Sequence, residues 1–495
     1  MLAAVIKAEN AKDALNVIKK AEGSDLAELR FDYAKNLDFE SKFLYDFISA
    51  AKSRNKPIII TNRTKEEGGA FCGSEDERMA ILKKAIELGA DYIDIECSAD
   101  KSSIKNLISS KKNTKVIVSY HNFNETPNNL KGVYSDIKKL NPDMIKIATS
   151  ANSVADNFGV FELIKFANRE KRKIIAFCMG SYGQFSRILS IILGSQVTYA
   201  SIENGKESAA GQFTIGEMNG VYRISKLNKN TKIAGLIGNP VEHSWSHVIH
   251  NAAFGKTGIN AAYMKFRVDN LEEFIRYFRK LNILGFSVTI PHKVEVIKCL
   301  DGIDEKAKAI GAVNTIAVKN KKLFGYNTDC YGAVEALKAK TRLKGKDAVI
   351  LGAGGSARAL AYGLVENGAN VTILNRTLKN AKTIADDFGC GYGTLEDLSR
   401  IDYDILINTT PVGMHPYVNH SPIPSSLVRK NTIVFDIVFN PLKTKLIREA
   451  ERKGCVAISG FEMLIRGAAL QFKLWTGKDA PEKLMRKKVL DYVKN

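Results

Sequence analysis

The first half of the chain repeats one hydrophobic pattern. Short apolar segments rich in β-branched residues are bounded by turn residues and separated by stretches with helical periodicity. They predict strands at residues 2–6, 25–31, 57–61, 91–96, 115–119, 143–148, 173–178 and 196–201. Eight strands alternating with helices are typical of a (β/α)8 barrel, so we predict an α/β chain whose first domain is a barrel over residues 1–222.

A second pattern begins after a short polar segment, and we place the boundary near residues 225–230. The apolar strand KIAGLIG starts a new α/β region. Further along, DAVILGAGGSARALAYGL (347–364) reads as a strand, a glycine-rich turn and a helix, the local order of a dinucleotide-binding unit. We therefore predict a substrate-binding α/β domain from residues 230–335 and 460–495, and a Rossmann domain over residues 336–459.

Composition and charge narrow the environments and partners to consider. The 495 residues are 45% apolar and 25% charged, as in an ordinary globular protein, and no apolar run approaches the roughly 18 residues of a membrane span. Seven dispersed cysteines without a CxxC pair predict free thiols in a reducing cytoplasm. The net charge of +20 is spread over helix-like segments, which argues against nucleic acid or a membrane as partner and favours a solvated basic surface that attracts small anionic substrates. No oligomeric state is predicted.

Polar side chains gather where the predicted barrel strands end, which is where such barrels carry their chemistry. These residues are Glu28, Arg30, Asp32, Arg63, Glu96, His121, Lys146 and Arg187. Lys146 interrupts the apolar strand DMIKIA, where a charged ammonium is costly, so we expect a neutral amine in a dry pocket that attacks a ketone and forms an imine. The alternative for a lone lysine is a strand-end side chain whose ammonium reaches solvent.

Two further features of these strand ends favour the catalytic interpretation. His121 lies one strand away from Lys146 and can transfer protons near neutral pH, although a histidine taken alone is more often a core residue. Arg30, Arg63 and Arg187 follow neighbouring strands, and we expect them to converge on an anion such as a carboxylate.

Six motifs follow one another with a characteristic spacing in this half. They are ELRFD (28–32), TNRTKEEGG (61–69), SYHNFNETP (119–127), the lysine of MIKIA, MGSYGQFSR (179–187) and SAAGQ (208–212). In this order they resemble the type I 3-dehydroquinate dehydratases over essentially residues 1–220. The resemblance implies that Lys146 forms an imine with the C3 ketone of 3-dehydroquinate, while His121 removes a C2 proton and then protonates the departing C1 hydroxyl. It also implies that Glu67 orients its neighbours and that Arg187 pairs with the carboxylate. Ring hydroxyls would be contacted by Glu28, Arg30 and Arg63. Ser208 and Gln212 would lie on a loop that closes the site.

The glycine-rich turn of the second half fits GxGxxA. Gly352 allows the tight turn, Gly354 lets the backbone approach a pyrophosphate, and Ala357 lets the helix pack closely on the strand. After the next strand, VTIL, an NAD site would usually have an acid, but this chain has Asn375 and Arg376, which predicts NADP. The full set of expected cofactor-binding residues is Gly352, Ala353, Gly354, Gly355, Ser356, Ala357, Asn375, Arg376, Thr377, Lys379, Thr409 and Met414.

The remaining motifs of the second half surround this turn. They are GNPVEHSWSHVIHN (238–251), SVTIPHK (287–293), GAVNT (311–315), GYNTD (325–329), INTTPVGM (407–414) and FEMLIRGAALQFKLWTG (461–477). Together they resemble shikimate dehydrogenase over roughly residues 232–495. The resemblance implies that Lys293 and Asp329 form the catalytic pair. It implies substrate contacts by Ser244 and Ser246 to the carboxylate and by Thr289, Asn314 and Asp329 to hydroxyls.

Three substrate-side positions depart from the shikimate dehydrogenase pattern. His247 stands where proline is usual, Phe439 where tyrosine is usual, and Gly467 where a substrate-binding glutamine is expected. Loss of two polar contacts weakens binding by about 1 kcal/mol or more each, unless other groups compensate. A dehydrogenase redirected to quinate or a related hydroxy acid therefore stays an alternative, as does a catalytically silent sensor. The seven histidines include no HExxH or other metal-ligand spacing, so no metal is predicted.

Overall fold

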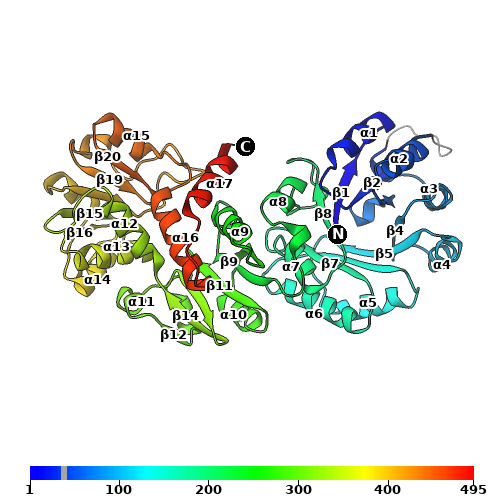
Figure 1. Ribbon diagram of the computed structural model, residues 1–495, viewed down its shortest axis with the longest axis horizontal. Helices are drawn as coiled ribbons and strands as arrows, with labels where there is room; N and C mark the ends of the chain where they lie inside the picture. Colours follow the sequence, from blue (N-terminus) through cyan, green and yellow to red (C-terminus); the bar gives the residue numbers. More distant parts are fainter. Residues whose placement is uncertain (35–41, 495) are drawn as a thin grey trace. The chain divides into compact units, whose positions relative to one another are not determined.

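The computed structural model describes residues 1–34 and 42–494 (Figure 1). Their contacts group them into two compact units, one of residues 1–232 with 266–277 and one of residues 233–265 with 278 onward. The predicted division of the second half into two domains stays a prediction. No helix in the described part of the chain is both long and apolar enough to cross a membrane.

An eight-stranded parallel sheet forms the first unit, in the order β7-β6-β5-β4-β3-β2-β1-β8. Its strands are β1 (Leu2–Lys7), β2 (Leu26–Arg30), β3 (Ile58–Thr61), β4 (Tyr92–Glu96), β5 (Lys115–Asn122), β6 (Met144–Ser150), β7 (Ile174–Met179) and β8 (Thr198–Ser201). The backbone N–H of Gln196, two residues before β8, donates to the carbonyl oxygen of Ile174 in β7 at 2.8 Å and so connects the two outer strands of this order. The predicted (β/α)8 barrel is confirmed.

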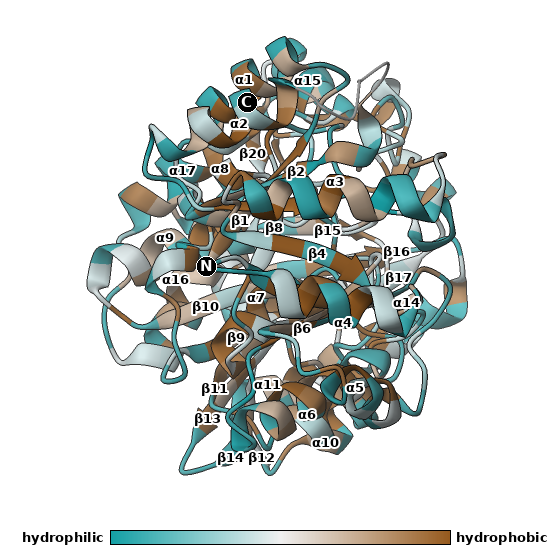
Figure 2. Ribbon diagram, turned by 90° about the vertical axis from the view of Figure 1, so that its right-hand side faces the viewer, coloured by the Kyte–Doolittle hydropathy of each residue, from teal (hydrophilic) through white to brown (hydrophobic). Residues whose placement is uncertain are grey.

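Helices follow the strands and present polar residues outward. They are α1 (Ala11–Lys20), α2 (Lys42–Lys52), α3 (Glu75–Glu87), α4 (Lys101–Ser110), α5 (Leu130–Lys138), α6 (Asp156–Arg169), α7 (Ser186–Leu193) and α8 (Ile215–Gly220). Capping boxes start α3, between Ser74 and Glu77, and α8, between Thr214 and Glu217. Figure 2 shows hydrophobic residues in brown on the strands and hydrophilic residues in teal on outer faces of helices such as α3 and α4. The segment after α8, which we predicted to be a polar linker, buries Tyr222 and Ile224.

The second unit contains two six-stranded sheets. The first has the order β10-β9-β11-β13-β14-β12 and mixes parallel and antiparallel pairs. Its elements are β9 (Lys232–Gly238), α9 (Ser246–Thr257), β10 (Ala261–Arg267), β11 (Ile283–Val288), β12 (Gly302–Ile303), α11 (Glu305–Ile310), β13 (Thr315–Lys319), β14 (Lys322–Tyr326) and α12 (Thr328–Lys338). Between β10 and β11 the chain forms α10 (Leu271–Phe278), whose residues up to Tyr277 group with the first unit.

The other sheet is fully parallel, in the order β17-β16-β15-β18-β19-β20. Its elements are β15 (Asp347–Leu351), α13 (Gly355–Glu366), β16 (Asn370–Leu374), α14 (Leu378–Phe388), β17 (Gly391–Gly393), β18 (Ile405–Asn408), β19 (Ile433–Asp436), α15 (Lys445–Arg452) and β20 (Val456–Ser459). The strand order reverses between β15 and β18, and ligands of such doubly wound sheets bind at that point. The predicted Rossmann-type sheet is confirmed.

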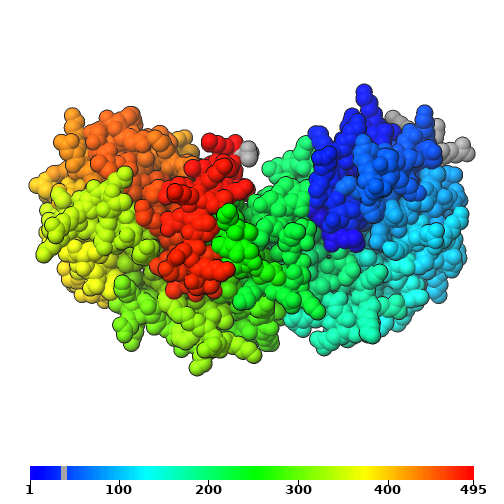
Figure 3. All heavy atoms as spheres, in the orientation of Figure 1, coloured from blue at the N-terminus to red at the C-terminus, as the bar shows by residue number. Residues whose placement is uncertain are grey.

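Two C-terminal helices complete the second unit, α16 (Gly460–Thr476) and α17 (Glu482–Lys494). Both pack against α9, so the end of the chain, in red in Figure 3, lies against a segment more than 200 residues earlier. Helix α16 also packs against α12. The C-terminal helices therefore help to position residues on α9 and α12.

Candidate active sites

One cavity lies at the carboxyl ends of the barrel strands, where the sequence predicted a site. The lining includes every residue predicted to bind or transform substrate in this half: Glu28, Arg30, Arg63, Glu67, His121, Lys146, Arg187, Ser208 and Gln212. Phe123, Phe177 and Tyr199 add aromatic walls. Ser208 and Gln212 hold each other, since the Ser208 N–H and hydroxyl both donate to Gln212 Oε1, at 2.8 and 3.2 Å. The structure therefore brings these predicted residues together.

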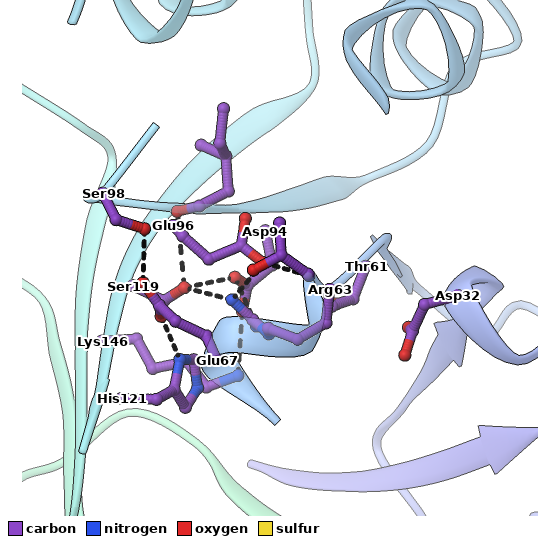
Figure 4. Close-up of polar contacts among 12 residues, drawn as sticks. Asp32, Thr61, Arg63, Glu67, Asp94, Glu96, Ser98, Ser119, His121 and Lys146 are labelled. Carbon is purple, nitrogen blue, oxygen red and sulfur yellow. Dashed lines mark hydrogen bonds and ion pairs between the residues drawn. The ribbon is translucent and has the colours of Figure 1, made fainter. Parts of the chain in front are cut away.

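Lys146 is buried in the middle of β6, and its surroundings differ from our prediction. Its Nζ donates to Asp94 Oδ2 at 2.8 Å and lies 3.8 Å from Glu28 Oε1 (Figure 4). The ring of Tyr199 lies below the same nitrogen, 4.5 Å away at its centroid. The sequence suggested an apolar, dry pocket for a neutral amine, whereas the structure supplies a carboxylate partner and an aromatic face, both of which favour a cation.

His121 belongs to a short polar chain at the end of β5. Its Nδ1 lies 3.0 Å from Glu67 Oε2, and the Ser98 hydroxyl donates to Glu67 Oε1 at 2.6 Å. Burial, with the nearby cations Arg63 and Lys146, holds the pKa of His121 well below its usual value. Burial also raises the pKa of Glu67 to about 6. A carboxylate beside Nδ1 favours the tautomer protonated there, which leaves a lone pair on Nε2 for accepting a proton.

All three arginines of the barrel mouth line the cavity, and two of them pair with acids of the protein itself. Arg30 pairs with Asp32 at 2.7 Å. Arg63 pairs with Asp94 at 2.8 Å and with Glu96 at 3.2 Å. Two of the three guanidinium groups are thus neutralised within the protein. The sequence alone did not reveal which acids face them.

Arg187 is the exception among them. It is 1% exposed, has no acidic partner among the described residues, and its Nε makes no hydrogen bond. One contact is a donation from NH2 to the carbonyl oxygen of Ala210 at 3.3 Å, and the guanidinium lies over the ring of Phe177. Burial lowers the pKa of Arg187 to about 10. A buried cation that faces a cavity without a counter-ion is suited to an anionic ligand.

Sequence reasoning missed two residues of this site, Asp94 and Tyr199. Asp94 lies within β4 and is fully buried, and its other oxygen accepts hydrogen bonds from Arg63 and Ser119. The signal that could have found it is the charged position two residues before Glu96 in the apolar strand YIDIE. Tyr199 resembles an ordinary core aromatic in the sequence, and only its position below Lys146 distinguishes it.

In the second unit, Lys293 and Asp329 form the predicted pair. Lys293 Nζ lies 2.5 Å from Asp329 Oδ2 and donates to Ser356 Oγ at 3.2 Å. Asn314 Nδ2 donates to the other Asp329 oxygen at 2.7 Å. Ser356 lies in the first turn of α13, so the pair is next to the glycine-rich turn. The structure thereby places Lys293 next to the expected dinucleotide site.

Predicted substrate contacts lie on neighbouring elements of the first six-stranded sheet. Ser244 and Ser246 approach each other at the start of α9, with 3.1 Å between their hydroxyl oxygens. Thr289 follows β11, where its methyl group lies so close to Gly238 that a Cβ there would be 2.3 Å away. The side chains of Ser244, Ser246 and Thr289 are thus placed by the ends of two parallel strands, β9 and β11.

The three departures from the family pattern have distinct surroundings. His247 is buried with its ring edge-on to Tyr492. Phe439 packs against Trp245, with ring centroids 5.3 Å apart. A Cβ on Gly467 would meet the Thr328 carbonyl oxygen at 3.4 Å, an ordinary contact, so backbone space does not require glycine there.

Residues expected at the dinucleotide turn fit a phosphate-binding site. Gly352 has φ +107°, and a Cβ there would lie 2.7 Å from the Thr409 hydroxyl across the point where the strand order reverses. Gly354 caps α13, and a Cβ on it would meet nothing within 4 Å, so a ligand can approach the backbone. Ala353, Gly355 and Ala357 complete the turn and first helical residues.

The outer part of this region is basic and open. Arg376 and Lys379 are exposed, and Asn375 Nδ2 donates to the Thr377 carbonyl oxygen at 3.0 Å. Met414 is 36% exposed. Two cations with solvent access after β16 suit a 2′-phosphate. Among the described residues, no cluster of three or more acidic, histidine or cysteine side chains could hold a metal ion.

Family models match both halves of the chain. The model of type I 3-dehydroquinase matches residues 2–229. The shikimate dehydrogenase substrate binding domain matches residues 236–316, and shikimate / quinate 5-dehydrogenase matches residues 335–442. The shikimate 5'-dehydrogenase C-terminal domain matches residues 460–490.

Individual relatives agree with these matches. The chain is 39% identical over 484 residues to the bifunctional 3-dehydroquinate dehydratase/shikimate dehydrogenase, chloroplastic, of Arabidopsis thaliana, which covers 93% of this chain and 79% of that protein. It is 43% identical over 280 residues to shikimate dehydrogenase (NADP(+)) of Methanocaldococcus jannaschii, 54% of this chain and 99% of the relative. A crystal structure of shikimate dehydrogenase in complex with NADP+ shares 41% identity and a TM-score of 0.52, covering 54% of this chain and 98% of that one. The chain therefore belongs to the family of bifunctional 3-dehydroquinate dehydratase/shikimate dehydrogenases.

Proposed function

We propose that the barrel dehydrates 3-dehydroquinate to 3-dehydroshikimate through an imine on Lys146. Lys146 adds to the C3 carbonyl, two hydrogens of its ammonium group leave with the carbonyl oxygen as water, and the resulting protonated imine withdraws electrons from C2. His121, uncharged and oriented by Glu67, takes the C2 proton through Nε2 and returns it to the C1 hydroxyl, which leaves as water. Hydrolysis then frees the product and the lysine.

Substrate orientation falls to the other cavity residues. Arg187 pairs with the carboxylate, because it is the cavity arginine without an acidic partner among the described residues. Glu28, Arg30 and Arg63 contact ring hydroxyls through hydrogen-bonding positions that their bonds within the protein do not use. Ser208 and Gln212 close the site and exclude water, which fixes the reacting geometry.

The second unit reduces 3-dehydroshikimate to shikimate. NADPH, when bound at the glycine-rich turn, supplies the hydride. Lys293, held by Asp329 and Ser356, stabilises the negative charge that develops on the ketone oxygen and donates a proton to it. Ser244 and Ser246 bind the carboxylate, and Thr289, Asn314 and Asp329 bind the hydroxyls.

Binding of the cofactor is divided between two stretches of the Rossmann-type sheet. The turn from Gly352 to Ala357 receives the pyrophosphate, and Thr409 and Met414 line the neighbouring strand end. Asn375, Arg376, Thr377 and Lys379 receive the 2′-phosphate, so NADPH is preferred to NADH. In this arrangement the sheet of β9–β14 with α16 and α17 holds the substrate and the sheet of β15–β20 holds the dinucleotide. A cytoplasmic location rests on the seven dispersed cysteines, all free thiols.

The convergence of Lys146, the His121–Glu67 pair and Arg187 on one cavity carries the proposal for the barrel. Replacement of one lysine in each unit tests both activities in one chain. Lys146→Met is expected to form no 3-dehydroshikimate from 3-dehydroquinate but to reduce added 3-dehydroshikimate at the wild-type rate. Lys293→Met is expected to accumulate 3-dehydroshikimate and to lose reduction about 100-fold. A Lys146→Met chain that still dehydrates 3-dehydroquinate would contradict the assignment.

Phe439 and Gly467 favour one competing function, a dehydrogenase half that acts on quinate or a related hydroxy acid. Each removes a polar group that the shikimate dehydrogenase pattern provides. Oxidation of shikimate and of quinate with NADP+ separates the two candidates. We expect kcat/KM to be higher for shikimate, and equal or higher values for quinate would overturn that substrate assignment.

A further inference from the structure

Asp94 occupies the centre of the polar contacts in Figure 4, although the dehydration proposed above gives it no role. The side chain is fully buried in β4, and both carboxylate oxygens are engaged. Oδ2 accepts the hydrogen bond from Lys146 at 2.8 Å. Oδ1 accepts from the Arg63 guanidinium at 2.8 Å and from the Ser119 hydroxyl at 2.7 Å. Three donors, two within β5 and β6 and one just after β3, therefore fix the orientation of this carboxylate.

Among the described carboxylates, Asp94 is the one within hydrogen-bond distance of the Lys146 nitrogen. Glu28, the other acid close to it, lies 3.8 Å away and accepts a hydrogen bond from Thr61. The Tyr199 ring covers the nitrogen on another side and offers no acceptor atom along its face. A hydrogen on Nζ that points away from the cavity is therefore directed to Asp94.

The charges around Asp94 keep it anionic. Although burial works against ionisation, Arg63 and Lys146 lower the pKa of Asp94, with a smaller contribution from His121. Arg63 is in turn balanced by Glu96, and Glu96 by Arg78. A carboxylate with so little affinity for protons is a poor general base, so proton transfer is left to His121.

We propose that Asp94 is the counter-ion of the imine, accepting the N–H of the protonated nitrogen while the C2 proton is removed. When Lys146 adds to C3 and the carbonyl oxygen leaves as water, the nitrogen keeps one hydrogen and a positive charge. That charge draws the electron pair of the C2–H bond as His121 takes the proton, and the pair then expels the C1 hydroxyl, which leaves as water with that proton. A fixed anion at the nitrogen stabilises the cation throughout this sequence. The inference rests on the proposed dehydration.

Asp94→Asn tests the role, because it keeps the shape of the side chain and removes its charge. Asp143→Asn is the matched control. Asp143 precedes β6 at the opposite end of the strand, and it too accepts from a lysine, Lys111, at 2.7 Å. Two readouts are taken on the full chain with 3-dehydroquinate: kcat and KM of enone formation, and the rate at which borohydride converts the imine to a stable adduct, measured by mass spectrometry.

We expect Asp94→Asn to lower kcat about 100-fold with little change in KM, and to slow adduct formation by a similar factor. Asp143→Asn is expected to match the wild type in both readouts. A folded Asp94→Asn chain with wild-type kcat and wild-type adduct formation overturns the proposal. If the wild type itself forms no adduct, the proposed dehydration fails, which is a separate outcome.

Ser119→Ala keeps the proposal testable if Asp94→Asn does not fold, as judged by circular dichroism. This change retains the carboxylate and removes one of the bonds that orient it. We expect adduct formation to slow about tenfold, with KM unchanged. In that case a wild-type rate of adduct formation in Ser119→Ala overturns the role of Asp94.

Discussion

Proton transfer at the barrel mouth depends on single residues that hold one another in the required state. Glu67 lies between the Ser98 hydroxyl and the His121 ring, and burial raises its pKa to about 6. Above this pH Glu67 is a carboxylate and accepts a hydrogen bond from the Nδ1–H group of His121. Below it Glu67 is protonated, and the preference for the reactive tautomer of His121 is lost.

The pH dependence of dehydration follows from this chain. Since the pKa of His121 is held well below its usual value, we expect the rate to rise with the ionisation of Glu67 at about pH 6. Glu67→Gln removes this ionisation, so the variant is expected to be slower at neutral pH and to lack the rise. Profiles of kcat against pH for both proteins make the comparison. An unchanged rise in Glu67→Gln would exclude Glu67 as its source.

Burial of the Arg187 guanidinium lowers the stability of the protein, and the same group is expected to bind the carboxylate of the substrate. This buried guanidinium has no acidic partner among the described residues, and the Ala210 carbonyl oxygen and the ring of Phe177 compensate only part of the lost hydration. We expect Arg187→Met to raise the free energy of unfolding by about 1–3 kcal/mol and to raise KM for 3-dehydroquinate at least about tenfold. Thermal unfolding and steady-state kinetics measure the two effects. A variant that is less stable than the wild type would show that Arg187 is structural.

At the scale of elements, the end of β3 shows how alternation decides the surroundings of a side chain. Thr61 and Arg63 point to the polar interior, where Thr61 donates to Glu28 at 2.8 Å and Arg63 pairs with Asp94. Asn62, between them, points the other way. It is fully buried, and within the described chain neither of its side-chain polar atoms has a hydrogen-bond partner.

Substitutions at these neighbouring positions are expected to have opposite effects on stability. Asn62→Leu removes an unsatisfied buried amide and should stabilise the barrel by about 1–2 kcal/mol. Thr61→Val removes a satisfied bond and leaves Glu28 with one donor fewer, so it should destabilise by about 1 kcal/mol. Calorimetry of the full-length variants gives both shifts. Destabilisation by Asn62→Leu would mean that its amide is satisfied in solution.

Helix α16 carries both the departure at Gly467 and a buried glutamine one turn later. Gln471 accepts from the Ser287 hydroxyl at 2.9 Å, lies 3.2 Å from His250 and donates to Thr315 at 2.9 Å. These contacts fix α16 against α9, β11 and β13. Because the amide of Gln471 is occupied by these hydrogen bonds, Gln471 does not replace the glutamine that the shikimate dehydrogenase pattern has at position 467.

Restoring the usual residues tests whether the pocket still recognises shikimate. Gly467→Gln and Phe439→Tyr each add a polar group, and the contact distances at Gly467 leave room for a Cβ atom. We expect KM for shikimate to fall about fivefold for each, which corresponds to about 1 kcal/mol per hydrogen bond. Ratios of kcat/KM for shikimate and quinate, measured before and after, reveal any change of preference. A rise in KM for shikimate would indicate a pocket adapted to another substrate.

The sequence predicts secondary-structure elements better than it predicts which side chains pair with one another. The strands of the barrel follow from local apolar patterns, and Lys146, His121 and Arg187 could be located because chemistry collects at strand ends. Which acid meets which cation depends on register between strands and on the stagger of the barrel, which no local pattern encodes. For this reason Asp94 was missed, and the pairing of Arg30 with Asp32 and of Arg63 with Asp94 was not predicted.

The whole molecule consists of two compact units, each with its own core and its own candidate site. The barrel site depends on Lys146 and the second site on Lys293, and no residue is shared between them in the proposed chemistry. The product of the first reaction is the substrate of the second. One chain therefore performs two consecutive reactions.

A single time course tests this claim most directly. The purified chain is incubated with 3-dehydroquinate while enone absorbance is followed, and NADPH is added once the absorbance is steady. We expect the enone to form first and then to be consumed as NADPH is oxidised, with shikimate as the product. An enone that never forms would contradict the assignment of the barrel, and an enone that persists in the presence of NADPH would contradict the assignment of the second unit.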